Sequence, residues 1–297
     1  MTDPLDALRA PVTPADPDPA FAARLRARLE RALGLPEGVA VTEISPTPAG
    51  RAQGAEPAAA PPRQGDISYA SLWVPDVARA AAFYGAVFGL EYLPAHNQRG
   101  RQAPGLAPPQ GLWEVPGGPA LFCSYVVDDA AAAVARVRAA GGQAGEPVPR
   151  PYGLTADCVD ADGARFALHQ PLAGPSAAGR PPGGPGHDGD LAYLTLEVAD
   201  PARTLEFYGA VLGWRWLPGR SPGGWQVEGT TPMIGVSGGH TAPAAVPVWQ
   251  VADAAVAVAR VRAAGGTATE PHREPYGVMA ECTDDQGTRF SLGQFPG

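Results

Sequence analysis

The chain has 297 residues and a net charge of −8, with 30 acidic side chains against 22 basic ones. A length of this order accommodates about two domains, and the negative charge argues against electrostatic binding to nucleic acid or to an anionic membrane surface. All of the basic side chains are arginines, which excludes a Schiff-base lysine and any phosphate-binding loop that needs lysine.

Residues 1–64 form an N-terminal extension with one predicted helix, at about residues 19–33. Asp18 is placed to cap this helix, and Pro19 suits its first turn. Apolar side chains recur every four residues and form a single stripe: Phe21, Leu25, Leu29 and Leu33. We expect the stripe to pack on the rest of the chain or on a sister subunit. Residues 46–64 are rich in proline and alanine and are predicted to be an extended tether.

The remainder of the chain is a duplicated unit. The segment Gly65–Gly89 recurs as Gly189–Gly213 at an offset of 124 residues, and the same offset relates pairs along the whole unit: Arg136 and Arg260, Tyr152 and Tyr276, Cys158 and Cys282, Gly163 and Gly287. A repeat this long lies outside the range of about 20 to 50 residues that is typical of solenoids. The sequence therefore predicts two globular domains, at residues 65–171 and 189–297, joined by a proline- and glycine-rich linker at residues 172–188.

Each domain is predicted to contain two copies of a strand–helix–strands pattern. In the first domain a strand at Ile67–Val74 precedes a helix at Val77–Phe88, which Asp76 caps and Gly89 terminates. Further strands are expected at residues 112–115, 121–127, 154–159 and 165–170, with a second helix in DDAAAAVARVRAAGG and a loop at residues 94–111. The result is an α+β fold of paired βαβββ halves, with helices on one face of each sheet and a groove on the other.

The cysteines and the N-terminal sequence predict a reduced, cytoplasmic protein. The three cysteines are too few and too widely spaced for a disulfide framework or a zinc ribbon, and all lie in apolar, strand-like runs: Cys123, Cys158 and Cys282. The first residues lack a basic region followed by an apolar run, and no stretch approaches the ~18 apolar residues of a membrane span. We therefore expect buried free thiols, no export and no membrane partner.

Three sequence signatures occur in both copies. They are a strand–Asp–helix opening that ends in FYGAVFG or FYGAVLG, an Asp–helix–Gly–Gly middle, and a DxDG-like turn before the last strand, in DADGARFAL and DDQGTRFSL. Together they resemble the vicinal oxygen chelate superfamily, which includes glyoxalase I, bleomycin-resistance proteins and extradiol dioxygenases. The resemblance implies two tandem glyoxalase-like domains, each with a cupped sheet and its helices outside. It also implies that the tandem imitates a homodimer, so that the protein is a monomer acting as a pseudo-dimer or a homodimer.

The resemblance further implies where a divalent metal would bind. In metal-using members the ligands are His, Gln or Glu on the first strand, on the strand that opens the second half, and at the fourth residue after the turn glycine. The corresponding residues are Tyr69, Phe122 and Ala167 in the first domain and Tyr193, Val246 and Ser291 in the second. None of these is a usual metal ligand. No cofactor is therefore predicted, and a metal would need displaced ligands, with the candidates His169, Glu197, Glu114 and Glu228.

Polar and aromatic side chains gather on the expected groove face of each sheet. Alternation along the first strands puts Tyr69, Trp73, Tyr193 and Glu197 on this face, away from the helices. Arginine suits a carboxylate, enolate or phosphate group, although an internal ion pair is an alternative. The tyrosines of the repeated PYG motif are placed to orient a ligand or to pack the turn. The predicted ligand-binding residues are Tyr69, Trp73, Tyr152, Arg165, Tyr193, Tyr276 and Arg289.

Two differences between the copies mark the candidate catalytic groups. Trp73 is replaced by Glu197 in the second copy, and His169 by Gly293, so we expect the copies to bind different things or only one to act. A glutamate or histidine in a partly apolar groove can serve as a general base. No Ser/His/Asp, Cys/His or HExxH arrangement is present. The other histidines fall in predicted loops without paired spacing and are expected at the surface: His96, His187, His240 and His272.

The leading hypothesis is a protein that binds a small organic molecule, aromatic or anionic, without the usual metal. The first alternative is an enzyme of the glyoxalase or dioxygenase type, acting as a lyase, isomerase or oxygenase with displaced ligands or metal-free acid and base groups. The second alternative is a scaffold or interaction protein that uses the N-terminal helix for recognition. Because one fold hosts all three functions, the site has to decide between them.

Overall fold

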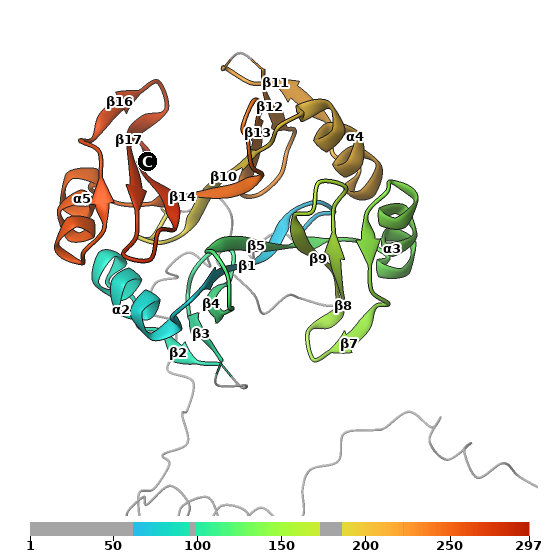
Figure 1. Cartoon of the computed structure of the whole chain (residues 1–297), viewed down its shortest axis with the longest axis horizontal. Helices are drawn as coiled ribbons and strands as arrows, with labels where there is room; N and C mark the ends of the chain where they lie inside the picture. Colours follow the sequence, from blue (N-terminus) through green and yellow to red (C-terminus); the bar gives the residue numbers. More distant parts are fainter. Residues whose placement is uncertain (1–61, 96–98, 173–185, 222, 297) are drawn as a thin grey trace, which may run out of the picture. The chain divides into compact units, whose positions relative to one another are not determined.

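The computed structural model describes residues 62–95, 99–172, 186–221 and 223–296. The predicted N-terminal helix, and most of the predicted tether and linker, lie outside the described residues, so the domain boundaries stay predictions. In the described residues the two repeats form two mixed β-sheets with four α-helices (Figure 1). This is the predicted α+β fold of paired βαβββ halves.

The first repeat forms one sheet in which β1 and β5 are the central, antiparallel pair. The strand order is β2-β3-β4-β1-β5-β9-β8-β6, with β7 paired to β8. The strands are β1 (Ile67–Val74), β2 (Leu93–Pro94), β3 (Gly100–Ala103), β4 (Gln110–Glu114), β5 (Ala120–Val126), β6 (Gln143–Ala144), β7 (Val148–Arg150), β8 (Gly153–Val159) and β9 (Arg165–Pro171). The helices are α2 (Val77–Phe88) and α3 (Ala130–Ala139).

The second repeat has the same topology, with β10 and β14 as the central pair. The strand order is β11-β12-β13-β10-β14-β18-β17-β15, with β16 paired to β17. The strands are β10 (Leu191–Glu197), β11 (Trp216–Pro218), β12 (Gly224–Val227), β13 (Met233–Ser237), β14 (Ala244–Gln250), β15 (Thr267–Ala268), β16 (His272–Glu274), β17 (Gly277–Thr283) and β18 (Arg289–Gln294). The helices are α4 (Pro201–Leu212) and α5 (Ala254–Ala263).

The first helix of each repeat begins and ends at residues with strong local preferences. The Asp76 carboxylate accepts hydrogen bonds from the backbone N–H groups of Ala78 and Arg79, both at 2.9 Å, and so caps two otherwise unpaired donors of α2. Gly89 ends the helix at φ 71°, a left-handed conformation that favours glycine. On α4, Asp200 accepts from one backbone N–H group, that of Ala202, and Gly213 ends the helix at φ 73°. The bounds predicted for α2 are confirmed.

Alternation along β1 sorts its side chains onto two faces. Ala70, Leu72 and Val74 are at most 4% exposed and belong to the hydrophobic core on the helix side, as predicted. The loop predicted at residues 94–111 is wrong in part, because Gly100–Ala103 forms β3. This segment has no apolar alternation of its own. Pairing with β4 places it in the sheet, which is a tertiary effect that local propensity does not report.

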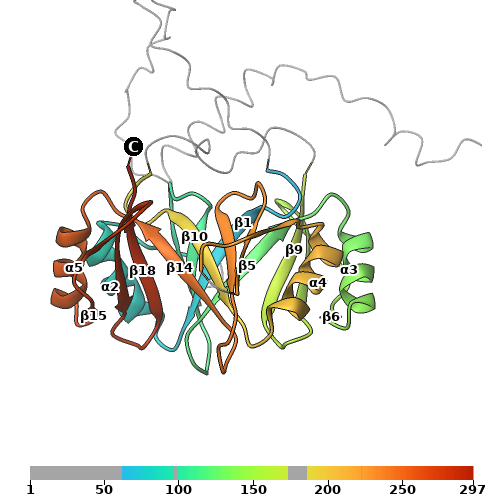
Figure 2. The same ribbon diagram turned by 90° about the horizontal axis from the view of Figure 1, so that it is seen from above.

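The first helix of each repeat also packs against the other repeat. Figures 1 and 2 show α2 beside α5 and α3 beside α4, on opposite sides of the central strands. The ring of Phe83 on α2 lies 6.3 Å from that of Phe290 on β18, and the ring of Phe207 on α4 lies 6.2 Å from that of Phe166 on β9. One hydrophobic core therefore spans both repeats, which form a single packed unit.

Two further sequence predictions concern the cysteines and membrane-spanning segments. The three cysteines are free and buried, as predicted, and burial raises the pKa of each thiol to about 12. No helix in the described part of the chain is both long and apolar enough to cross a membrane.

Candidate functional site

A cavity of about 490 Å³ lies between the two repeats, at the C-terminal ends of β1 and β10 and the N-terminal ends of β5 and β14. The first repeat contributes Trp73 near the end of β1 and Arg165 at the start of β9, and the second contributes Glu197 and Arg289 at the equivalent places on β10 and β18. We call this cavity the shared pocket. The sequence assigned these residues to two separate grooves, whereas the structure gathers all four into one cavity.

An aromatic wall comes from the first repeat. The rings of Trp73 and Phe122 are stacked, with centroids 4.8 Å apart and an interplanar angle of 12°. The Arg165 guanidinium lies over the Trp73 ring, 5.9 Å from its centroid. Among the described residues no carboxylate forms an ion pair with Arg165, so this exposed cation faces the cavity with an aromatic neighbour only.

An ionic wall comes from the second repeat. Arg289 binds both carboxylate oxygens of Glu197, with the longer of the two contacts at 3.3 Å, and this hydrogen bonding raises the pKa of Arg289. His240 Nδ1 lies 3.5 Å from the same carboxylate, and His240 Nε2 is 3.0 Å from the Ser237 hydroxyl oxygen. The candidate base Glu197 is therefore held between two partners, and His240 is part of this cluster rather than an isolated surface side chain.

The inner end of the shared pocket is anchored by a hydrogen bond between the repeats. Asp160 accepts hydrogen bonds from the backbone N–H groups of Asp162 and Ala164 and, at 3.0 Å, from the hydroxyl of Tyr208 on α4. Burial raises the pKa of Asp160, and burial also raises the pKa of Tyr208 well above its usual value. Sequence reasoning missed this pair because its two members belong to different repeats.

The predicted tyrosines on the first strands, Tyr69 and Tyr193, are not among the residues that line the shared pocket. We call the regions around these two tyrosines the first cup and the second cup. Tyr69 reaches over Gly111, and Tyr193 over Gly235, at positions where a Cβ atom would overlap the phenol oxygen. Burial raises the pKa of both tyrosines, so they remain neutral hydrogen-bonding groups. The two glycines supply the space that the sequence pattern did not reveal.

His169 is engaged through both ring nitrogens in the first cup. Its Nε2 lies 3.2 Å from the carbonyl oxygen of Tyr152. Its Nδ1 lies 3.0 Å from the Ser68 hydroxyl oxygen, and the rings of Tyr152 and His169 meet edge to face at 5.6 Å. In this arrangement His169 holds the PYG turn against β9.

In the second cup an arginine, rather than a histidine, contacts the tyrosine of the PYG turn. The Arg220 guanidinium, from the loop after β11, lies over the Tyr276 ring at 5.7 Å from its centroid. Burial raises the pKa of Tyr276. His272 is exposed, as expected, but it lies on β16 rather than in a loop, and its Nε2 is 3.6 Å from Glu274 and 3.7 Å from Glu281.

The residues at the family's metal-ligand positions do not fit a metal. In the first repeat these are the neutral phenol of Tyr69, the ring of Phe122, which stacks on Trp73, and the methyl group of Ala167. In the second repeat Val246 and Ser291 likewise lack a strong ligand atom. Within the described ranges, no group of three or more His, Cys, Asp or Glu side chains is placed to hold a metal ion. Of the remaining candidates for displaced ligands, Glu114 is exposed and Glu228 pairs with Arg215 at 2.9 Å.

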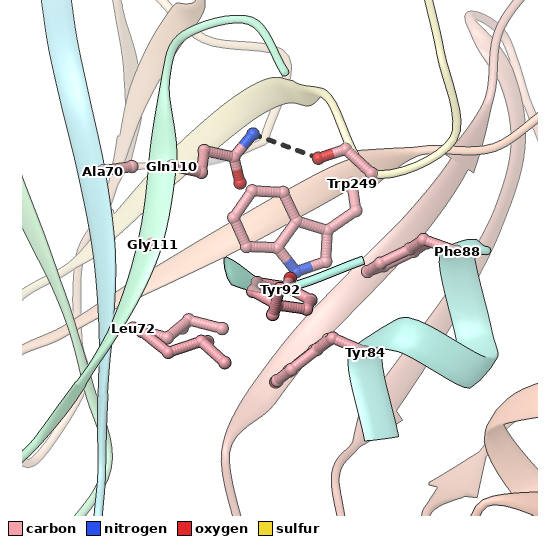
Figure 3. A pocket seen from close by; sticks show the side chains of 10 residues that line it. Ala70, Leu72, Tyr84, Phe88, Tyr92, Gln110, Gly111 and Trp249 are labelled. Carbon is pink, nitrogen blue, oxygen red and sulfur yellow. Dashed lines mark hydrogen bonds between the residues drawn. The ribbon is translucent and has the colours of Figure 1, made fainter. Parts of the chain in front are cut away.

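A second, much smaller cavity lies between the repeats and is structural. It has a volume of about 10 Å³, roughly one water molecule, and is lined by Tyr92, Phe88 and Trp249 (Figure 3). Trp249 Nε1 is buried and has no hydrogen-bond partner among the described residues, and Gln110 Nε2 donates to the carbonyl oxygen of Gly189 at 3.0 Å. The cavity is too small for an organic ligand.

These features define a class: a tandem α+β protein with two cupped sheets of paired βαβββ halves. Family models agree with it. Residues 66–168 match the Glyoxalase/Bleomycin resistance protein/Dioxygenase superfamily, and residues 193–293 match a glyoxalase-like domain. The two matches together cover more than half of the chain, which belongs to the glyoxalase and dioxygenase superfamily, also called the vicinal oxygen chelate superfamily, as a tandem two-domain member.

Solved structures with the same fold include glyoxalases and dioxygenases. An Mn(II)-bound glyoxalase from Novosphingobium aromaticivorans is similar with a TM-score of 0.63 and 18% identity, over 78% of this chain and 82% of that one. A 2,3-dioxygenase from Pseudomonas sp. KL28 has a TM-score of 0.58 and 15% identity, over 79% of this chain and 95% of that one. A 2,2',3-trihydroxybiphenyl 1,2-dioxygenase from Sphingomonas wittichii strain RW1 has a TM-score of 0.57 and 15% identity, over 78% of this chain and 91% of that one. At these identities the likeness concerns the fold alone. A comparison of the sequence with curated proteins found no match.

Proposed function

We propose that this protein binds one small organic molecule per chain in the shared pocket, without using the metal centre of its superfamily. The observation that carries the proposal is the shared pocket itself. Its volume of about 490 Å³ falls within the ~300 to 1,000 Å³ range of small-molecule sites. Its lining combines a stacked aromatic pair with charged groups, which is the composition expected of such a site.

Three contacts would hold the ligand. The Trp73 and Phe122 pair offers an apolar, planar surface on which a ring or chain loses contact with water. Arg165 offers donors in a fixed fork. The Glu197–Arg289 pair closes the opposite wall, with Val246 beside it. The metal-free part of the proposal is supported by the side chains at the family's ligand positions, which lack donor atoms suited to a divalent ion.

A small-molecule library screened by thermal shift, followed by crystallography of the hits, tests the location of the site. Replacing Trp73 with alanine removes the aromatic wall, and hits should then bind about tenfold more weakly or worse. Val148→Ala is the matched control, because this exposed residue lies on β7, outside the pocket lining. Ligands found in either cup, or bound unchanged by the Trp73→Ala variant, would refute the proposed site.

Elemental analysis of protein purified without chelators tests the metal-free part. We expect no transition metal in stoichiometric amount and no change in ligand affinity on treatment with a chelator. One tightly bound metal per chain, whose removal abolishes ligand binding, would contradict the proposal.

A further inference from the structure

We infer that the ligand of the shared pocket is a flat aromatic monocarboxylate, and that Glu197 sets this selectivity by neutralising one of two equivalent arginines. The inference rests on the proposed function and names the ligand class of the same site. Arg165 and Arg289 stand at equivalent places, at the starts of β9 and β18, and both line the pocket.

The two arginines differ in what lies beside them. Glu197 occupies the place of Trp73 in the second repeat and binds Arg289 through both oxygens, so that this guanidinium is compensated. Arg165 lies instead over the indole of Trp73, which carries no net charge. One guanidinium of the two is therefore available to an acidic group, and a bidentate carboxylate matches its fork.

The acidic side chains that line the pocket are engaged elsewhere. Asp162 pairs with Arg203 at 3.3 Å, and Asp160 is held by two backbone N–H groups and by Tyr208. Neither forms an ion pair with Arg165 within the described part of the chain. Among the described residues, the pocket thus presents one arginine without a carboxylate partner on the first-repeat side and a closed ion pair on the second-repeat side.

Shape and charge together define the ligand. The nearly parallel rings of Trp73 and Phe122 favour a planar apolar body next to Arg165. A second carboxylate on the ligand would find no free partner in the second-repeat wall, because Glu197 already occupies the Arg289 guanidinium through both of its oxygens. A monoanion is therefore accepted and a dianion disfavoured.

Isothermal calorimetry with three probes of one ring system tests this: 2-naphthoate, the neutral 2-naphthamide and 2,6-naphthalenedicarboxylate. The wild type should bind 2-naphthoate about tenfold more tightly than the amide, as expected for a charge-assisted hydrogen bond at an exposed arginine. Arg165→Gln should abolish that preference. Arg150→Gln, an exposed arginine on β7 outside the pocket lining, should leave it unchanged.

The Glu197→Gln variant supplies a gain of binding that a merely unfolded protein cannot show. It removes the charge that neutralises Arg289, so the dicarboxylate should gain about fivefold or more relative to 2-naphthoate. Failure of 2-naphthoate to bind the wild type, equal affinity for the acid and the amide, or an unchanged dicarboxylate preference in Glu197→Gln would each overturn the inference. Acid and amide that bind equally, and are both lost in Trp73→Ala, would leave the proposed function intact.

Discussion

Replacing Tyr84 with phenylalanine tests whether the two repeats are one folded unit. Tyr84 lies on α2 and is 1% exposed, and its hydroxyl donates to Asp284 Oδ2 in the other repeat at 3.0 Å. The other oxygen of Asp284 keeps the backbone N–H groups of Gln286 and Thr288, at 2.9 and 2.7 Å. The variant therefore leaves one buried carboxylate oxygen without its donor.

The size of the effect follows from burial. Burial and the charge of Asp284 raise the pKa of Tyr84 well above its usual value, so the phenol is a neutral donor across the working pH range. Removing a hydrogen bond to a charged group costs about 1.5 to 3 kcal/mol. For a unit of this size that lowers the unfolding midpoint by roughly 3 to 10 °C. Tyr208→Phe removes the equivalent bond to Asp160, which is half-buried and which water can reach, so we expect a smaller loss of about 0.5 to 1.5 kcal/mol.

Chemical denaturation followed by circular dichroism and by tryptophan fluorescence measures both variants. Because the core is continuous across the repeats, we expect one transition with coincident midpoints, shifted as a whole in each variant. The two hydroxyl groups donate to different carboxylates, Asp284 and Asp160, so the losses should add in the double variant. Two separate transitions, with only one moved by Tyr84→Phe, would refute the single unit. A larger loss for Tyr208→Phe would refute the argument from burial.

Three further outcomes follow from single residues. Gly235→Ala should cost about 1 to 3 kcal/mol in denaturation, because a Cβ would overlap the Tyr193 hydroxyl, whereas Gly118→Ala meets open space and should cost far less; equal losses would contradict this. Because burial raises the pKa of Asp160 above its ordinary value of 3.8, the folded state holds this proton to higher pH than the unfolded chain. The free energy of unfolding of the wild type, relative to that of Asp160→Asn, should therefore be greatest below pH 3.8 and should fall as the pH rises through the pKa of the folded state. A relative stability that rises over this range would contradict the raised pKa. Disulfide-exchange reagents at pH 8 should label the three thiols slowly in the folded protein and completely on unfolding, since burial raises their pKa values to about 12; the thiols are those of Cys123, Cys158 and Cys282. Rapid labelling of any one of them in the folded protein would contradict its burial.

Local chemistry explains what the sequence predicts well. The bounds of α2 follow from the Asp76 carboxylate and the left-handed Gly89, which act within a few residues of each other. The core face of β1 follows from strict alternation, and the Ala70, Leu72 and Val74 side chains face the helices. Such features depend only on neighbours in sequence, and because the unit is duplicated, each pattern can be read in both copies.

The shared pocket was not predictable in the same way. Alternation assigns Arg165 and Arg289 to the grooves of their own domains, but it does not report which strand ends meet across a domain boundary. The Tyr208–Asp160 bond and the contact between His240 and Glu197 are likewise tertiary, and His240 has no spacing to a partner that would mark it. The register of 124 residues relates equivalent positions in the two copies, but it gives no distance between them.

The asymmetry of the shared pocket requires two repeats in one chain. In a homodimer, a cavity on the two-fold axis presents every side chain twice, so two arginines are either both free or both paired. A tandem repeat removes this constraint, because Trp73 and Glu197 can differ while Arg165 and Arg289 stay the same. A single unpaired guanidinium suits a ligand with one acidic end, whereas a symmetric pair suits a dianion or two ligands. Glu197→Trp would restore symmetry at this position, and by this reasoning it should convert a site that takes one monoanion into one that takes a dianion.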